Sequence, residues 1–133
     1  SLHGDRVQAA AETYMGLVEV GVGLIPAGGG TKEMLLRAPD ARTAFETIGF
    51  GKVSTSGPHA RQLGYLRDAD GITMNRERLI ADAKAAALTL ARAGYQPPVR
   101  RTDIPVGGPT TYAMLALGIH LAHRAGRISD HDE

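Results

Sequence analysis

Along the first thirty residues, the pattern of apolar and polar positions favours short extended segments. Two strands are expected, around residues 5–10 and 16–20, with a polar turn at Glu12-Thr13 between them. The motif IPAGGG that follows predicts a loop, because Pro26 cannot donate to a β-ladder and consecutive glycines admit backbone shapes closed to other residues.

From Thr31 onward the apolar residues recur with a helical period, and capping residues and breakers set the expected limits. The first expected helices run from Thr31 to a stop at Pro39, over 40–49, and over 58–63 with Ser56 as cap and Gly64 as stop. A strand is expected at 71–73, followed by a helix over 76–93 that Asn75 begins and Gly94 stops. A loop over 96–108 then leads to a last helix from Pro109 to Gly126.

Composition narrows the class of protein. The chain has 133 residues, of which 43% are hydrophobic and 22% charged, and its net charge is +1. These values are typical of one globular domain in water, and no basic stripe interleaved with aromatics favours nucleic acid. The absence of Cys excludes disulfides and zinc-thiolate sites within this sequence and is compatible with the cytoplasm. No apolar run reaches the roughly 18 residues that a membrane span requires.

Neither common nucleotide-binding motif fits the glycine loop. A P-loop needs Lys and Ser or Thr directly after its last glycine, but Gly29 and Gly30 follow Gly28. A dinucleotide fingerprint is interrupted by Pro26. Two alternatives remain for this loop: a tight turn into a helix, or a backbone surface that a substrate approaches closely, with the helix-start amides facing it.

Other clusters of polar residues give weaker indications of a metal site or a catalytic nucleophile. His120 and His123 lie three residues apart, and His131 stands among acidic residues, but a metal site needs a third ligand and a second shell. We therefore expect a solvated helix face and no metal. Ser54 and its two neighbours lack a nucleophile motif, and we interpret them as helix-entry residues.

Glu19 is the only charge between Glu12 and Lys32, and valine and leucine flank it. An aliphatic environment disfavours the charged form of a carboxyl group, which suits general acid/base catalysis near neutral pH. The alternative is a Glu at the edge of a strand that faces solvent or pairs with an Arg. The residues alone leave both possibilities open.

Several motifs together resemble the crotonase (enoyl-CoA hydratase/isomerase) superfamily. They are GLVEVGVGLIPAGGGTKEM at 16–34, KVSTSGPHARQLGYL at 52–66 and LIADAKAAALTLA at 79–91. The Lys-Glu-Met after the glycines, ARQLGYLRDADGITMN and GRISDHD make the chain more similar to the crotonase-like domain fused to a 3-hydroxyacyl-CoA dehydrogenase in bacterial multifunctional fatty-acid oxidation proteins. The similarity covers essentially the whole chain.

The resemblance implies a fold, an activity and a site. The fold would be α/β, a crotonase-type spiral of short strands and helices, with strands and the glycine loop in 1–30 and a helical part in 31–133. Glu19 would carry the proton at the α-carbon of an acyl-CoA thioester, in a hydratase or an isomerase. The substrate-binding residues would be Gly16, Leu17, Val18, Pro26, Gly28 and Gly29. No cofactor is expected on this chain, and NAD would bind only to a separate dehydrogenase domain.

The resemblance also implies that half of the active site is elsewhere. In the family, the oxyanion-hole amides and the first catalytic glutamate precede the segment that this chain matches. We therefore expect a piece of a longer polypeptide, the C-terminal portion of one crotonase-like domain, which is inactive alone. Its partners would be acyl-CoA, the remaining N-terminal part of the domain and further copies in a homo-oligomer. The alternative is a non-catalytic module that binds acyl-CoA or mediates assembly.

Overall fold

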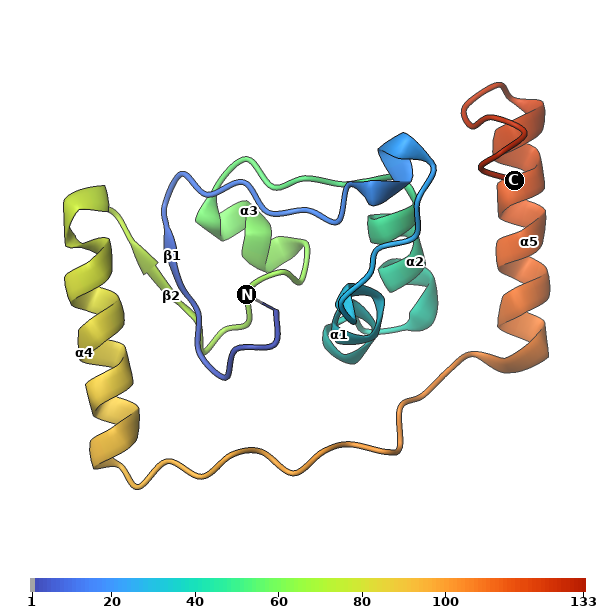
Figure 1. Ribbon diagram of the computed structural model, residues 1–133. Coiled ribbons are helices and arrows are strands. Elements are labelled where there is room, and N and C mark those ends of the chain that lie inside the picture. Colours follow the sequence, from blue (N-terminus) through green and yellow to red (C-terminus); the bar gives the residue numbers. More distant parts are fainter. Residues whose placement is uncertain (1) are drawn as a thin grey trace. The chain divides into compact units, whose positions relative to one another are not determined.

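A computed structural model describes residues 2–133 of the chain (Figure 1). The chain forms two compact units, each built from two segments. The first unit joins the chain up to Gly16 with Val53–Thr102, and the second joins Leu17–Lys52 with Asp103–Glu133. The elements are, in chain order, β1 (Gln8–Ala10), η1 (Glu19–Val22), α1 (Gly30–Arg37), α2 (Ala41–Gly49), α3 (Gly57–Gln62), β2 (Gly71–Thr73), η2 (Arg76–Arg78), α4 (Leu79–Arg92) and α5 (Gly108–Arg124).

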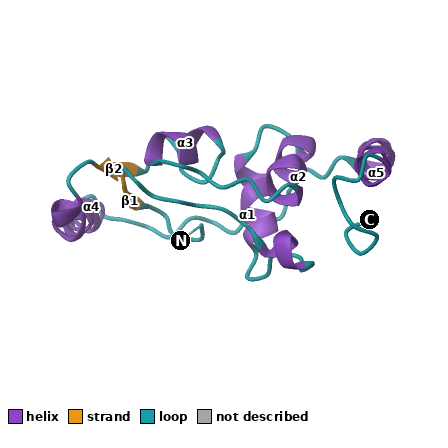
Figure 2. Ribbon diagram, turned by 90° about the horizontal axis from the view of Figure 1, so that it is seen from above, coloured by secondary structure: helices purple, strands orange, loops and turns teal. Residues whose placement is uncertain are grey.

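A two-stranded parallel sheet organises the first unit. β1 pairs with β2 in the register Gln8 to Gly71 and Ala10 to Thr73, and α4 packs against β1 (Figure 2). The Gln8 side chain crosses to the neighbouring strand, where its Nε2 donates to Thr73 Oγ1 at 2.8 Å. Gly71 makes room for this side chain, because a Cβ there would lie 2.0 Å from Gln8 Oε1 and the Gln8 side chain would have to move. Of the three expected strands, those at 5–10 and 71–73 are thus confirmed, although β1 is shorter than residues 5–10.

Buried polar side chains hold the loops of the first unit. Asp70 is 3% exposed, and its carboxylate accepts hydrogen bonds from the backbone N–H groups of Val7 and Arg67 and from the Arg67 guanidinium. Ser54 is fully buried; it accepts from Met15 N–H at 2.9 Å and donates to the Thr13 carbonyl at 3.1 Å. Ser54 is therefore not a helix-entry residue as expected: only Ser56 caps α3.

Packed helices form the second unit. α1 contacts α2, and α2 contacts α5. Met34 of α1 is 1% exposed and is one of the largest fully buried side chains, with Ala44, Thr47 and Ala122 also buried. Such burial of apolar surface is worth about 25 cal/mol per Å² and is the main stabilisation available to this unit.

The predicted helices all form, and their limits follow local signals. Asp40 caps α2 by accepting from Thr43 N–H, and Asn75 caps the 3-10 turn that leads into α4. The expected cap at Thr31 is wrong, because α1 begins at Gly30 after Gly29, which adopts a φ of 77°. A left-handed Gly can occupy this position, whereas Thr31 lies inside the first turn.

The later helices leave apolar side chains exposed. α4 has no buried residue, and its Ile80 is 83% exposed; on α5, Leu117 is 59% exposed. Among residues 2–133, none of the helices combines the length and the hydrophobicity that a membrane span requires.

Candidate active site

The candidate catalytic residue Glu19 begins a 3-10 turn and does not lie in a strand. The expected strand over 16–20 is wrong: residues 13–18 have no regular structure, and η1 covers Glu19–Val22. Val18, Val20 and Val22 have strand propensity, but propensity is overridden when no neighbouring strand pairs with the segment. Gly23 ends the turn with a φ of 72°, a backbone conformation that residues with a Cβ rarely adopt.

Backbone hydrogen bonds define this turn. Gly21 N–H donates to the Val18 carbonyl at 2.9 Å, Gly23 N–H to the Val20 carbonyl at 3.0 Å, and Leu24 N–H to the Glu19 carbonyl at 3.1 Å. No side chain caps η1 at its start. The position of Glu19 therefore depends on its own backbone and on what contacts Gly23.

The Glu19 carboxylate has an orphaned oxygen. Glu19 is half-buried, and its Oε2 is inaccessible to solvent yet has no hydrogen-bond partner among the described residues. Leaving a buried polar atom unpaired costs roughly 1–3 kcal/mol, so such an atom in a folded protein requires an explanation. In the described part of the chain, no Arg donates to this oxygen, as the considered Arg pairing would require.

The glycine loop forms a tight junction with the segment before Glu19. Gly28 has a φ of 62°, and α1 starts two residues later without a side-chain cap. A Cβ on Gly30 would lie 2.9 Å from Leu17 Cδ2, so the Leu17 side chain packs directly on the start of α1. Pro26 is buried, whereas a Cβ on Gly28 would meet no atom within 4 Å. The loop is thus a tight turn into a helix, with empty space beside the Cβ position of Gly28.

The predicted substrate-binding residues divide between the two units. Leu17, Val18, Pro26, Gly28 and Gly29 belong to the second unit together with Glu19, whereas Gly16 is the last residue of the first segment of the first unit. Within the second unit, Leu17 contacts the helix start, and Val18 is 53% exposed. Their role toward a substrate stays a prediction.

The C-terminal tail folds back on α5 and reaches the Glu19 turn. His123 Nε2 lies 2.7 Å from Asp130 Oδ1, and His120 Nδ1 lies 2.9 Å from Glu133 Oε1. His131 Nε2 lies 3.0 Å from the Gly23 carbonyl. The hydrogen bond that His123 donates to the Asp130 carboxylate raises the pKa of His123. Sequence reasoning assigned no function to this tail.

The histidines of α5 are paired with carboxylates and not grouped around a metal position. Among the described residues, no group of three or more His, Asp and Glu side chains could hold a metal ion. His120 is 57% exposed, as expected for a solvated helix face, but the His123 side chain is only 27% exposed because the tail covers it.

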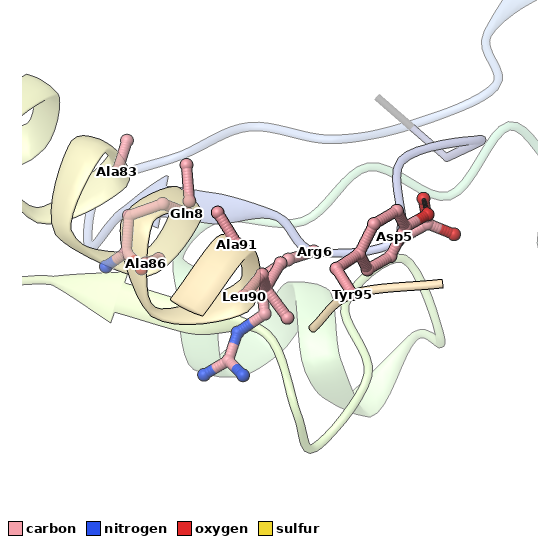
Figure 3. Close-up of a pocket in the computed structure, with 9 residues that line it drawn as sticks. Asp5, Arg6, Gln8, Ala83, Ala86, Leu90, Ala91 and Tyr95 are labelled. Carbon is pink, nitrogen blue, oxygen red and sulfur yellow. Dashed lines mark hydrogen bonds between the residues drawn. The ribbon is translucent and has the colours of Figure 1, made fainter. Parts of the chain in front are cut away.

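A separate cavity lies in the first unit, between β1 and α4 (Figure 3). Its volume is about 350 Å³, and alanines of α4 form much of its wall, with Arg6, Gln8 and Tyr95 at its edge. The Tyr95 hydroxyl donates to the Asp5 carboxylate, and this hydrogen bond raises the pKa of Tyr95. None of the predicted site residues lines this cavity.

Comparison with known proteins gives two similarities, and no family model matches the chain. A probable 3-hydroxyacyl-CoA dehydrogenase of Bacillus subtilis (strain 168) is 47% identical over 139 residues, which cover 98% of this chain and 18% of that protein. The chain therefore spans less than a fifth of that relative. It is thus similar to a fragment of a much longer protein, as the motifs indicated.

Among solved structures, the chain is similar to a carnitinyl-CoA hydratase from Mycobacterium avium. The TM-score is 0.57 at 20% sequence identity, and the match covers 98% of this chain and 49% of that chain. At this identity the similarity concerns the fold. It confirms the predicted α/β class and the crotonase-type arrangement of a partial domain.

Proposed function

We propose that this chain, which has the crotonase-type fold, is part of an enoyl-CoA hydratase/isomerase-type domain in a 3-hydroxyacyl-CoA dehydrogenase protein of fatty-acid oxidation. Two similarities support the proposal: the relative named as a 3-hydroxyacyl-CoA dehydrogenase and the structural neighbour named as a carnitinyl-CoA hydratase. Both names denote enzymes that act on acyl groups carried by coenzyme A.

The observation that carries the catalytic assignment is the orphaned oxygen of Glu19. Its Oε2 is buried and has no hydrogen-bond partner in the described residues, although a carboxylate oxygen is a strong acceptor. If Glu19 served only to stabilise the fold, this oxygen would be expected to accept a hydrogen bond from a donor of the chain. A proton carrier needs a carboxylate oxygen that no protein donor engages.

In the proposed reaction, Glu19 exchanges the α-proton of an acyl-CoA thioester. As base, a carboxylate oxygen takes the proton from the α-carbon, and the C–H electron pair moves into an enolate whose negative charge rests on the thioester oxygen. As acid, Glu19 returns the proton to carbon and the enolate collapses. Two N–H donors at the thioester oxygen would stabilise this charge, and such an oxyanion hole is usually the largest catalytic contribution.

The rest of the site would come from both sides of Glu19. We assign acyl-group contacts to Gly16, Leu17, Val18, Pro26, Gly28 and Gly29. Gly28 suits this role because nothing lies within 4 Å of the place where its Cβ would be, so a substrate can approach the backbone closely. We assign the oxyanion hole to the N-terminal part of the same domain, which fits the 49% coverage of the hydratase.

The setting of the reaction follows from the same proposal. The chain itself binds acyl-CoA as substrate and no cofactor, NAD binds to a separate dehydrogenase domain, and the protein works as a homo-oligomer in the cytoplasm. The exposed apolar side chains of α4, and separately those of α5, are consistent with assembly, because exposed apolar surface often marks an interface.

The test is the Glu19→Gln variant of the full-length protein, with Glu12→Gln as the matched control. Glu12 is an exposed glutamate of the preceding turn. Glutamine keeps the shape of the side chain but cannot accept the proton, so kcat for crotonyl-CoA should fall by roughly 10²- to 10⁴-fold. The control should keep its activity, and the isolated chain should show no turnover.

The competing function is a non-catalytic module that binds acyl-CoA or mediates assembly. The strongly exposed Ile80 and Leu117 favour this reading, since they offer surface for contacts with other parts of a protein. Unchanged enoyl-CoA turnover in the Glu19→Gln variant would select this alternative and remove the catalytic assignment.

A further inference from the structure

We propose that His131 is a positioning residue that holds the turn on which Glu19 lies. The inference rests on the proposed function of Glu19 for its catalytic consequence and on geometry for the contact itself. The His131 Nε2–H donates to the Gly23 carbonyl at 3.0 Å, although 108 residues separate the two in sequence.

Gly23 links His131 to Glu19. The Gly23 N–H bonds back into the turn, to the carbonyls of Glu19 and Val20, and its carbonyl accepts from His131. The His131 ring also fills the space beside Gly23: its Cδ2 and Nε2 atoms lie 2.7 and 2.8 Å from the place of a Cβ. Gly23 is therefore fixed on both sides, by the Glu19 backbone and by the imidazole.

Both sequence neighbours of His131 make hydrogen bonds that fix the segment carrying it. Asp130, the preceding residue, pairs with His123 of α5 at 2.7 Å. Asp132, the following residue, accepts from Ser129 Oγ at 2.7 Å and from Ser129 N–H at 3.0 Å. These bonds close the tail into a compact turn that is anchored on α5. His131 thereby lies against Gly23 of the same unit.

The expected consequence is catalytic more than structural. His131 and its hydrogen bond are exposed, so its loss removes little buried surface. By contrast, the turn that carries Glu19 has no side-chain cap, and the imidazole supplies the contact at its other end. A small displacement of a catalytic group from its reacting position is enough to slow the reaction strongly.

The experiment compares His131→Ala and His131→Gln in the full-length protein. The Gln Nε2 can donate to the Gly23 carbonyl, whereas Ala cannot. His131→Ala should lower kcat by roughly ten- to a hundredfold with KM within about twofold, because positioning acts on the chemical step. His131→Gln should recover most of this loss.

The matched control is His120→Ala, which removes another tail contact without touching Gly23. It should leave kcat within about twofold of the parent protein. Equal losses in His120→Ala and His131→Ala would overturn the inference, because they would reflect general loosening of the tail. A loss in His131→Gln as large as that in His131→Ala would also overturn it.

A readout independent of activity separates this inference from the proposed function. Hydrogen exchange of the Gly23 and Leu24 amides reports on opening of the turn, since both donate within it. Exchange should be faster in His131→Ala and unchanged in His131→Gln, whatever Glu19 does. If Glu19→Gln keeps full activity while exchange responds as expected, only the catalytic proposal fails. If exchange in His131→Ala is unchanged, the inference on His131 is wrong.

Discussion

The two units hold their loops in different ways. In the first unit, fully buried polar side chains tie the loops: Asp70 joins Val7 to Arg67, and Ser54 clamps the chain at Met15. In the second, the loop of greatest interest, at Glu19, is held by its own backbone bonds and by one exposed imidazole. The first arrangement resists opening because unpaired buried groups are costly, whereas the second leaves the candidate catalytic turn adjustable.

The largest expected effect is on the first unit, in Asp70→Ala. Removing this carboxylate leaves the Val7 and Arg67 N–H groups without their acceptor, which should lower the opening free energy around β1 by about 2–4 kcal/mol. Hydrogen exchange of the Gly71 amide, which donates to the Val7 carbonyl, measures it. The control is Asp68→Ala, at an exposed neighbour. Equal effects of the two substitutions would contradict the comparison.

Protonation of Asp70 at low pH should weaken the structure around β1 in the same way as the Asp70→Ala substitution. Burial opposes the charged form of Asp70, but the hydrogen bonds from Arg67 and Val7 outweigh it and hold its pKa below the usual value of 3.8. A carboxyl group with a lowered pKa adds stability that is present above its unfolded pKa and is lost as pH falls through the folded one. The Gly71 amide should therefore lose protection only below about pH 4, and in Asp70→Ala this acid step should disappear.

A smaller, local effect is expected in the second unit for Gly23→Ala. The φ of 72° costs an L-residue about 1–2 kcal/mol, and the new Cβ also meets the His131 ring. Gly94→Ala is the control, because its φ of 73° is nearly the same and nothing lies within 4 Å. Faster exchange at Leu24 in Gly23→Ala, with β1 unaffected, would support separate opening of the two units. Loss of protection at β1 would argue against it.

The smallest expected effect concerns the tail. The hydrogen bond to Asp130 raises the pKa of His123 above its usual value of 6.5. A group with a raised pKa adds stability that is complete below the unfolded pKa and is lost as pH rises through the folded one. The tail should therefore open more readily as pH rises above about 6.5, measured by exchange of residues 127–133 after correction for intrinsic rates. Asp130→Asn should weaken this dependence, and an unchanged dependence would exclude the pairing as its cause.

Local signals were enough to place most helices. Asp40, Ser56 and Asn75 each accept a hydrogen bond from an N–H two or three residues away, so the cap and the helix start are encoded together. Pro39 and Gly94 are equally local signals, because each stands two residues after the last residue of the helix that it ends. The motifs around Glu19 also predicted the crotonase-type fold, because a family motif can be recognised from the order of its residues without knowledge of their contacts.

Tertiary structure decided what surrounds Glu19. A segment rich in valine becomes a strand only if another strand pairs with it, and residues 16–20 instead lead into a turn that Gly23 closes. Ser54 could not be distinguished from Ser56 by sequence, because its partners at Thr13 and Met15 lie about forty residues away. The bond from His131 to Gly23 joins residues 108 apart. Hydrogen bonds act over about 3 Å, so only the folded chain determines which distant groups come within that range.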